Sequence, residues 1–152
     1  MIPSSVFVYG TLRPGQINYP LVGSAVVRHV AARLSGHALR AAATARYPYA
    51  TEDESNSLTG DLLQLKPGTE AAVLERLDIL EGYDPRAFVL EMSHYVRVRR
   101  TVITAAESPT GPAGTPIEAW VYLAGPATPV SELPAVADGD WTTRSRFDPR
   151  WS

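Results

Sequence analysis

Alternation of apolar and polar positions is the clearest pattern along this chain, and it predicts strands. Residues 57–65, 95–104 and 117–124 alternate in this way, which is the period of a half-buried strand. Residues 32–39 form a further run, and the glycine inside it is typical of a bulge or a barrel corner. Residues 6–8 are a short continuous run of β-branched and aromatic side chains, which also favour a strand.

One stretch, residues 69–81, has the period of an amphipathic helix instead. Its apolar positions recur at spacings that place them on one helix face: Val73, Leu74, Leu77 and Leu80. Thr69 is a suitable N-cap residue. Several strands with a single helix predict an α+β fold built on a small barrel or closed sheet.

Glu81 falls inside the apolar arc of this helix, and Asp78 lies at the edge of the arc. Burial disfavours the charged form of a carboxylate and raises its pKa, so Glu81 is a candidate general base. Two simpler interpretations remain open, because helix ends fray. In the first, the Glu81 side chain points into solvent, and in the second it pairs with an arginine such as Arg97.

A second candidate feature follows the first strand, where residues 6–8 run into a turn that contains Gly10, Pro14 and Gly15. A buried strand that ends in such a turn leaves several backbone N–H groups unpaired and converging. An array of this kind binds anions and carbonyl oxygens. The alternative is an ordinary strand followed by an ordinary loop.

Composition narrows the functions that this chain supports. With 152 residues, 45% apolar and 20% charged, it is expected to form one domain, residues 1–152. A net charge of -2 gives no electrostatic reason to expect nucleic acid or membrane as a partner. Because there are no cysteines and no closely spaced histidines, we expect no metal site. No phosphate-binding or dinucleotide motif is present, so no cofactor is expected. We found neither a leader segment nor a membrane span, and a cytoplasmic location is the expectation.

Five short stretches, in this order, resemble the motifs of the γ-glutamylcyclotransferase-like family, which contains AIG2-like and BtrG-like proteins. They are VFVYGTL at residues 6–12, LDILEGY at 77–83, YVRV at 95–98, AWVY at 119–122 and GDW at 139–141. The first two in combination are specific, and the others alone are not.

This resemblance implies a small mixed β-barrel flanked by short helices, with a substrate cavity. It implies that Glu81 is the general acid and base, and that no cofactor takes part. The substrate's polar head would be held by four residues of the first turn: Tyr9, Gly10, Thr11 and Leu12. Tyr95 is a further candidate for substrate contact, although Phe88 is an alternative because residues 84–94 are long for the family. The implied reaction cyclises a γ-glutamyl group to 5-oxoproline.

Two functions are therefore in competition. The first is an enzyme that cyclises a γ-glutamyl amine or amide and releases the free amine, and the second is a non-catalytic module that binds a small carboxylate. A two-carboxylate hydrolase that uses Asp78 and Glu81 is disfavoured, because residues three apart on a helix are neighbours rather than partners across a bond. Residues 105–116 are rich in Pro and Gly and are predicted to form a mobile surface loop.

Overall fold

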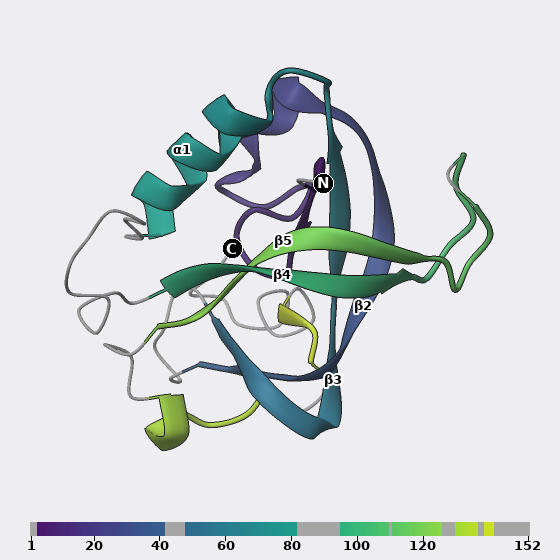
Figure 1. The fold of residues 1–152 in the computed structure, drawn as a ribbon. Coiled ribbons are helices and arrows are strands. Elements are labelled where there is room, and N and C mark those ends of the chain that lie inside the picture. Colours follow the sequence, from purple (N-terminus) through teal and green to yellow (C-terminus); the bar gives the residue numbers. More distant parts are fainter. Residues whose placement is uncertain are drawn as a thin grey trace.

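Five strands close into a barrel in the order β1-β3-β2-β4-β5 (Figure 1). The computed structural model describes residues 3–41, 48–81, 95–109, 111–125, 130–136 and 139–141. The strands are β1 Ser5–Val8, β2 Val26–Arg40, β3 Tyr49–Leu65, β4 Tyr95–Thr104 and β5 Pro116–Ala124. β1 and β5 run parallel, and the other neighbouring pairs are antiparallel. The barrel is therefore mixed, as predicted.

Short helical elements flank the barrel: η1 Tyr19–Leu21, η2 Gly23–Ala25, α1 Glu70–Glu81 and η4 Val130–Glu132. α1 begins one residue later than predicted, and the carbonyl of Thr69 accepts the N–H of Val73 as the first helical hydrogen bond (3.0 Å). Within the described ranges, no helix is long and apolar enough to cross a membrane.

β2 and β3 are much longer than their sequence patterns predict. The patterns cover residues 32–39 and 57–65, whereas the two strands pair from Val26↔Leu65 to Arg40↔Tyr49. Residues 51–57 of β3 are mostly exposed and polar, so they show no apolar alternation. β2 pairs with residues 51, 52 and 57 of this stretch. Gly36 has a φ of +75°, and the β2–β3 register shifts beside it. The sequence predicted a bulge or a barrel corner at this glycine, and the pairing is indeed interrupted there.

β1 is buried on both faces, which explains its unbroken apolar run. Phe7 points into the barrel, where it packs in one cluster with Leu34, Leu58, Val121 and Trp141. Val6 and Val8 point to the opposite face and join a second cluster, which includes Val73 and Leu77 of α1. The helix is thus fixed to the outside of the barrel beside the end of β1.

The buried face of α1 differs from the prediction at two positions. Leu80 was assigned to the apolar stripe, but it is 40% exposed. Asp78, which was placed at the edge of the stripe, is only 9% exposed. A carboxylate can take an interior position when it is paired and hydrogen-bonded, and Asp78 has three such contacts, described below.

β4 and β5 form the predicted hairpin, with a register that runs from Tyr95↔Ala124 to Ile103↔Pro116. The loop between them projects from the barrel (Figure 1) and is closed by reciprocal hydrogen bonds between the backbones of Ser108 and Gly111. Its mobility stays a prediction.

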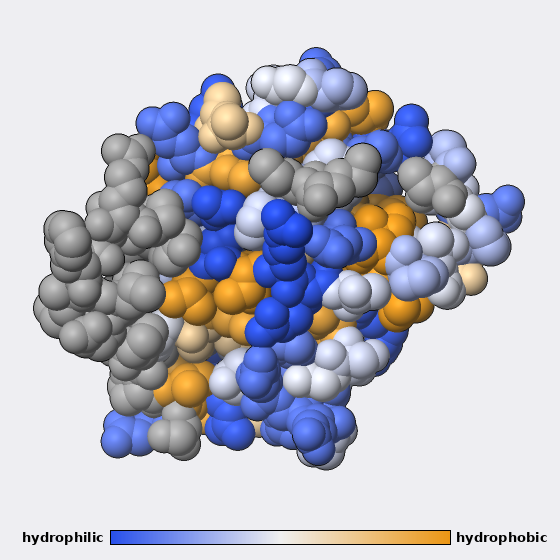
Figure 2. All heavy atoms as spheres, in the orientation of Figure 1, coloured by the Kyte–Doolittle hydropathy of each residue, from blue (hydrophilic) through white to orange (hydrophobic). Residues whose placement is uncertain are grey.

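Hydrophilic side chains cross the middle of the face in front of these strands (Figure 2). Two ion pairs formed by neighbouring residues of β4, Arg99–Glu118 and Arg100–Glu52, are open to solvent and contribute little to stability.

Candidate active site

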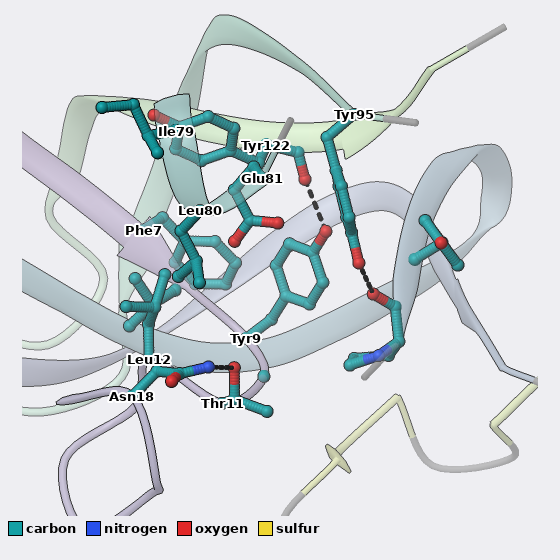
Figure 3. A pocket seen from close by; sticks show the side chains of 14 residues that line it. Phe7, Tyr9, Thr11, Leu12, Asn18, Ile79, Leu80, Glu81, Tyr95 and Tyr122 are labelled. Carbon is teal, nitrogen blue, oxygen red and sulfur yellow. Dashed lines mark hydrogen bonds between the residues drawn. The ribbon is translucent and has the colours of Figure 1, made fainter. Parts of the chain in front are cut away.

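A cavity of about 350 Å³ opens where the turn after β1 meets the last residues of α1 (Figure 3). The turn residues 9–12 form one side, and Ile79, Leu80 and Glu81 form another. Aromatic residues from β3, β4 and β5 complete the wall: Tyr49, Tyr95 and Tyr122. This volume falls in the range of about 300–1,000 Å³ that small-molecule sites occupy. The two features singled out in the sequence therefore lie in one cavity.

Glu81 reaches into this cavity from the last turn of α1 (Figure 3). Burial raises the pKa of its carboxyl from its ordinary value of 4.5 to about 7. No ion pair or hydrogen bond joins its side chain to another residue in the part of the chain that the structure describes. Glu81 thus lines a cavity rather than turning away from the protein, and within the described ranges it does not pair with Arg97, which binds another residue.

Arg97 pairs with Asp78 rather than with Glu81. Its guanidinium donates from Nε to Oδ1 at 2.9 Å and from a terminal nitrogen to Oδ2 at 3.2 Å. The hydroxyl of Tyr122 also donates to Oδ1 of Asp78. Asp78 is therefore engaged as an acceptor on both oxygens, and this removes it as the second carboxylate of a hydrolase.

The turn after β1 is held open by its own backbone and by Asn18. The N–H of Arg13 donates to the carbonyl of Gly10 (3.1 Å), and the N–H of Asn18 donates to the carbonyl of Thr11 (2.9 Å). The amide of Asn18 also donates to the hydroxyl of Thr11 (2.8 Å). Among the described residues, none accepts a backbone hydrogen bond from the N–H groups of Gly10, Thr11 or Leu12. That these groups bind the substrate stays a prediction.

The tyrosines of the cavity present neutral rings. The hydroxyl of Tyr9 donates to the carbonyl of Tyr122 and accepts the N–H of Ala50 (3.3 Å). Burial, and then the charge of Glu81, raise the pKa of Tyr9. Burial, followed by the hydrogen bond to Asp78, raises the pKa of Tyr122. Both residues stay protonated at neutral pH, and Glu81 is the group in this cavity that titrates there.

Tyr95 also lines the cavity, as the sequence predicted. Its hydroxyl donates to the carbonyl of Pro48 (2.9 Å), and its ring stacks on that of Tyr49 with centroids 4.7 Å apart. The alternative residue, Phe88, lies outside the described residues, as do Gly82 and Tyr83 of the LDILEGY motif. That Tyr9 and Tyr95 contact the substrate stays a prediction.

Arg13 ties the turn to two distant parts of the chain. Its Nε lies 2.7 Å from a carboxylate oxygen of Asp61 on β3, and a terminal nitrogen lies 2.9 Å from one of Asp140. Asp140 belongs to the GDW motif, whose Trp141 is buried inside the barrel and whose Gly139 has a φ of +65°. The residue that follows the first motif is thus joined to the last motif by an ion pair.

Comparison with known proteins decides the family. A family model for gamma-glutamyl cyclotransferase, AIG2-like proteins matches residues 6–143. The chain belongs to this family. The match includes the turn, Glu81 and the GDW motif. A comparison with curated protein sequences finds no match.

Solved structures support the AIG2-like fold. An AIG2-like protein from Mus musculus is 21% identical, with 97% of this chain and 91% of that chain covered and a TM-score of 0.64. A protein from Pyrococcus horikoshii is 18% identical, with 92% and 91% covered and a TM-score of 0.58. YkqA from Bacillus subtilis is 20% identical over 95% of this chain, with a TM-score of 0.58. This AIG2-like chain spans only 41% of the length of YkqA.

Several residues of this AIG2-like site were not identified from the sequence. Asn18 and Tyr49 lie in loop and strand-end segments, whose sequences carry no periodic pattern. Tyr122 was available as the last residue of the AWVY motif, and Asp78 as the second residue of LDILEGY. Their contacts join different elements, so only the folded chain reveals the Asp78–Tyr122 hydrogen bond.

Tyr9→Phe tests how much the buried hydrogen bonds of the Tyr9 hydroxyl contribute to stability. Because the variant lacks the hydroxyl, the carbonyl of Tyr122 loses a donor and the N–H of Ala50 loses an acceptor in a buried place. Each unsatisfied group costs about 1–3 kcal/mol, so the free energy of unfolding in a urea titration should fall by about 2 kcal/mol or more. The control is Tyr19→Phe, which changes a half-buried tyrosine of η1 and should cost much less. An unchanged unfolding midpoint for Tyr9→Phe would contradict the role of its hydroxyl.

Proposed function

We propose that this protein cyclises a γ-glutamyl amine or amide to 5-oxoproline and releases the free amine. The observation that supports it most strongly is the pKa of about 7 at Glu81, in a cavity that also exposes the turn after β1. A carboxyl with this pKa is substantially present in both protonation states near neutral pH. It can therefore serve as base and acid in one turnover.

The reaction is an intramolecular aminolysis. The α-ammonium of the γ-glutamyl group loses a proton to the Glu81 carboxylate, and the resulting amine attacks the γ-carbonyl carbon. A tetrahedral oxyanion forms, the bond between the γ-carbon and the amide nitrogen breaks, and Glu81 returns a proton to the departing nitrogen. Two protons in all pass from the α-nitrogen to the leaving amine, which is released as an ammonium ion. No redox change occurs.

The turn after β1 supplies the electrostatic part of this proposal. The N–H groups of Gly10, Thr11 and Leu12 are available to hold the α-carboxylate of the substrate or to stabilise the oxyanion. The rings of Tyr9 and Tyr95 form walls that keep the flexible glutamyl chain folded. Holding the attacking nitrogen near the carbonyl lowers the entropic part of the barrier.

The direct test is release of 5-oxoproline from a panel of γ-glutamyl amides, with mass spectrometric detection of both products. We expect a saturable, enzyme-dependent rate without added metal or cofactor. Saturable binding of γ-glutamyl ligands with no 5-oxoproline would support a non-catalytic binding module instead. Absence of both binding and turnover across the panel would reject a γ-glutamyl substrate.

The pH dependence of the rate is a specific prediction. Below pH 7 Glu81 becomes protonated and cannot accept the proton of the α-ammonium, so kcat/KM should fall as the pH falls. The acid limb should have an apparent pKa of about 7, well above the value of about 4.3 for an ordinary glutamate. A profile measured from pH 5 to 9 that is flat down to pH 5 would contradict Glu81 as the base.

A further inference from the structure

Two carboxylates lie three residues apart near the end of α1, but among the described residues only Asp78 has a cationic partner. Residues at this spacing on a helix are neighbours, with Cβ atoms about 5–6 Å apart. Arg97 of β4 makes two hydrogen bonds to Asp78, while Glu81 has no ion pair with a described residue. Because the two carboxylates are neighbours on the helix, the pairing of Arg97 with Asp78 rather than Glu81 needs a physical reason.

Three contacts hold Arg97 on Asp78. The guanidinium uses both oxygens of that carboxylate, at 2.9 Å and 3.2 Å, which fixes the orientation of its plane. The hydroxyl of Tyr122 donates to the same carboxylate. On its other side the guanidinium lies 4.5 Å from the centroid of the Trp120 ring, within the range of a cation–π contact. The two side chains are only 16% and 12% exposed, so solvent screens the pair weakly.

We propose that Asp78 is a positioning residue that holds the Arg97 cation away from Glu81 and so keeps the cavity carboxylate without a cationic partner. The functional consequence rests on the proposed role of Glu81 as the base. An opposite charge within about 4–6 Å lowers the pKa of a carboxylate by about 1–3 units. Glu81 paired with Arg97 would therefore be a permanently ionised and much weaker base.

The surroundings of Glu81 agree with this assignment. Among the described residues, the titratable groups that face the cavity from the other elements are tyrosines: Tyr9, Tyr49, Tyr95 and Tyr122. The nearby charged groups are paired: Arg97 on β4 with Asp78 on α1, and Arg13 in the turn after β1 with Asp61 and Asp140. Burial is accordingly the cause that raises the pKa of Glu81.

The test measures the titration of Glu81 directly, by NMR of ¹³C-labelled glutamate carboxyls, assigned by comparison with Glu81→Gln. Asp78→Asn keeps the shape and an acceptor for Tyr122 but removes the charge that holds Arg97. We expect the pKa of Glu81 to fall by about one unit or more. Arg97→Gln should shift it in the opposite direction, because the charge of Asp78 is then uncompensated. The double variant should return to within about half a unit of the original value, since both charges are gone.

Arg100→Gln is the matched control, because it breaks an exposed arginine–glutamate pair on the same strand. It should leave the titration of Glu81 unchanged. The inference is overturned if Asp78→Asn leaves the pKa of Glu81 where it was, or if the two single variants shift it in the same direction. If Asp78→Asn does not fold, the test uses the other two variants. The inference is supported if Arg97→Gln raises the pKa of Glu81 and the double variant cancels this rise. It is rejected if Arg97→Gln leaves that pKa unchanged.

The NMR titration needs no turnover, so the inference and the proposed function fail separately. If 5-oxoproline is not released but the shifts have opposite signs, the positioning role of Asp78 stands and the reaction does not. If the protein is active, the acid limb of kcat/KM should move with the NMR value in each variant. A purely structural role of Asp78 would lower the melting temperature without shifting that limb.

Discussion

Glu81→Gln is expected to lower the rate of 5-oxoproline release by about two to four orders of magnitude, the usual contribution of general acid–base catalysis. Glutamine keeps the shape of the side chain but cannot accept a proton and return it. Substrate binding should largely persist, because the backbone of the turn after β1 does the holding. The loss should therefore fall on kcat, with little change in KM.

The same variant should change stability in a pH-dependent way. In the folded protein the pKa of Glu81 is raised from 4.5 to about 7, so between these values the folded state binds more protons than the unfolded state. The free energy of unfolding contributed by Glu81 therefore falls as the pH rises through this window. Glu81→Gln lacks this penalty and should melt at a higher temperature than the original protein at pH 8, with the difference vanishing near pH 5.

Glu75→Gln is the matched control for both measurements, since Glu75 is exposed on the same helix. It should change neither the rate nor the pH dependence of melting. A Glu81→Gln protein that melts early and still cyclises its substrate would show that Glu81 is a structural residue and not the base.

The largest expected effect on stability belongs to Gly60→Ala, at the seam between β1 and β3. A Cβ at Gly60 would lie 2.3 Å from the carbonyl oxygen of Val8 and 2.7 Å from the ring of Phe7. Both neighbours are buried, and one is backbone, so the strands must separate to admit the methyl group. Overpacking of this kind costs about 1–3 kcal/mol, and a clash with backbone belongs at or above the upper end. Because β1 leads directly into residues 9–12, substrate affinity should fall as well.

Gly68→Ala separates this contact from the general effect of replacing glycine. Gly68 has a φ of +87° with nothing near the position of a Cβ, so its cost comes from backbone conformation alone. That cost is about 1 kcal/mol. Denaturant titration should therefore show that Gly60→Ala is clearly less stable than Gly68→Ala. Equal stabilities of the two variants would mean that β1 and β3 can accommodate the added methyl group without strain.

Much of this structure can be predicted from the local sequence, because the spacing of apolar residues along a strand or a helix reflects short-range geometry. The hairpin of β4 and β5 follows from period-two alternation, and α1 follows from the spacing of Val73, Leu74 and Leu77. The same spacing placed Glu81 on the side of the helix that faces the protein, and in the structure Glu81 lines the cavity. The motifs then predicted a mixed barrel and placed the turn and Glu81 at one cavity, where the structure has them.

Features that depend on contacts between distant parts of the chain could not be predicted from local patterns. The polar first half of β3 pairs with β2 at residues 49–52 and again from Ser57, which no local pattern in residues 51–57 reveals. Asp78 is buried and Leu80 is exposed because Arg97 and Tyr122, from two other strands, satisfy the carboxylate of Asp78. The helix period is enough to predict a carboxylate at the end of α1. Only the barrel decided that Arg97 binds Asp78, and that burial alone raises the pKa of Glu81, because both depend on which side chains the closed sheet brings together.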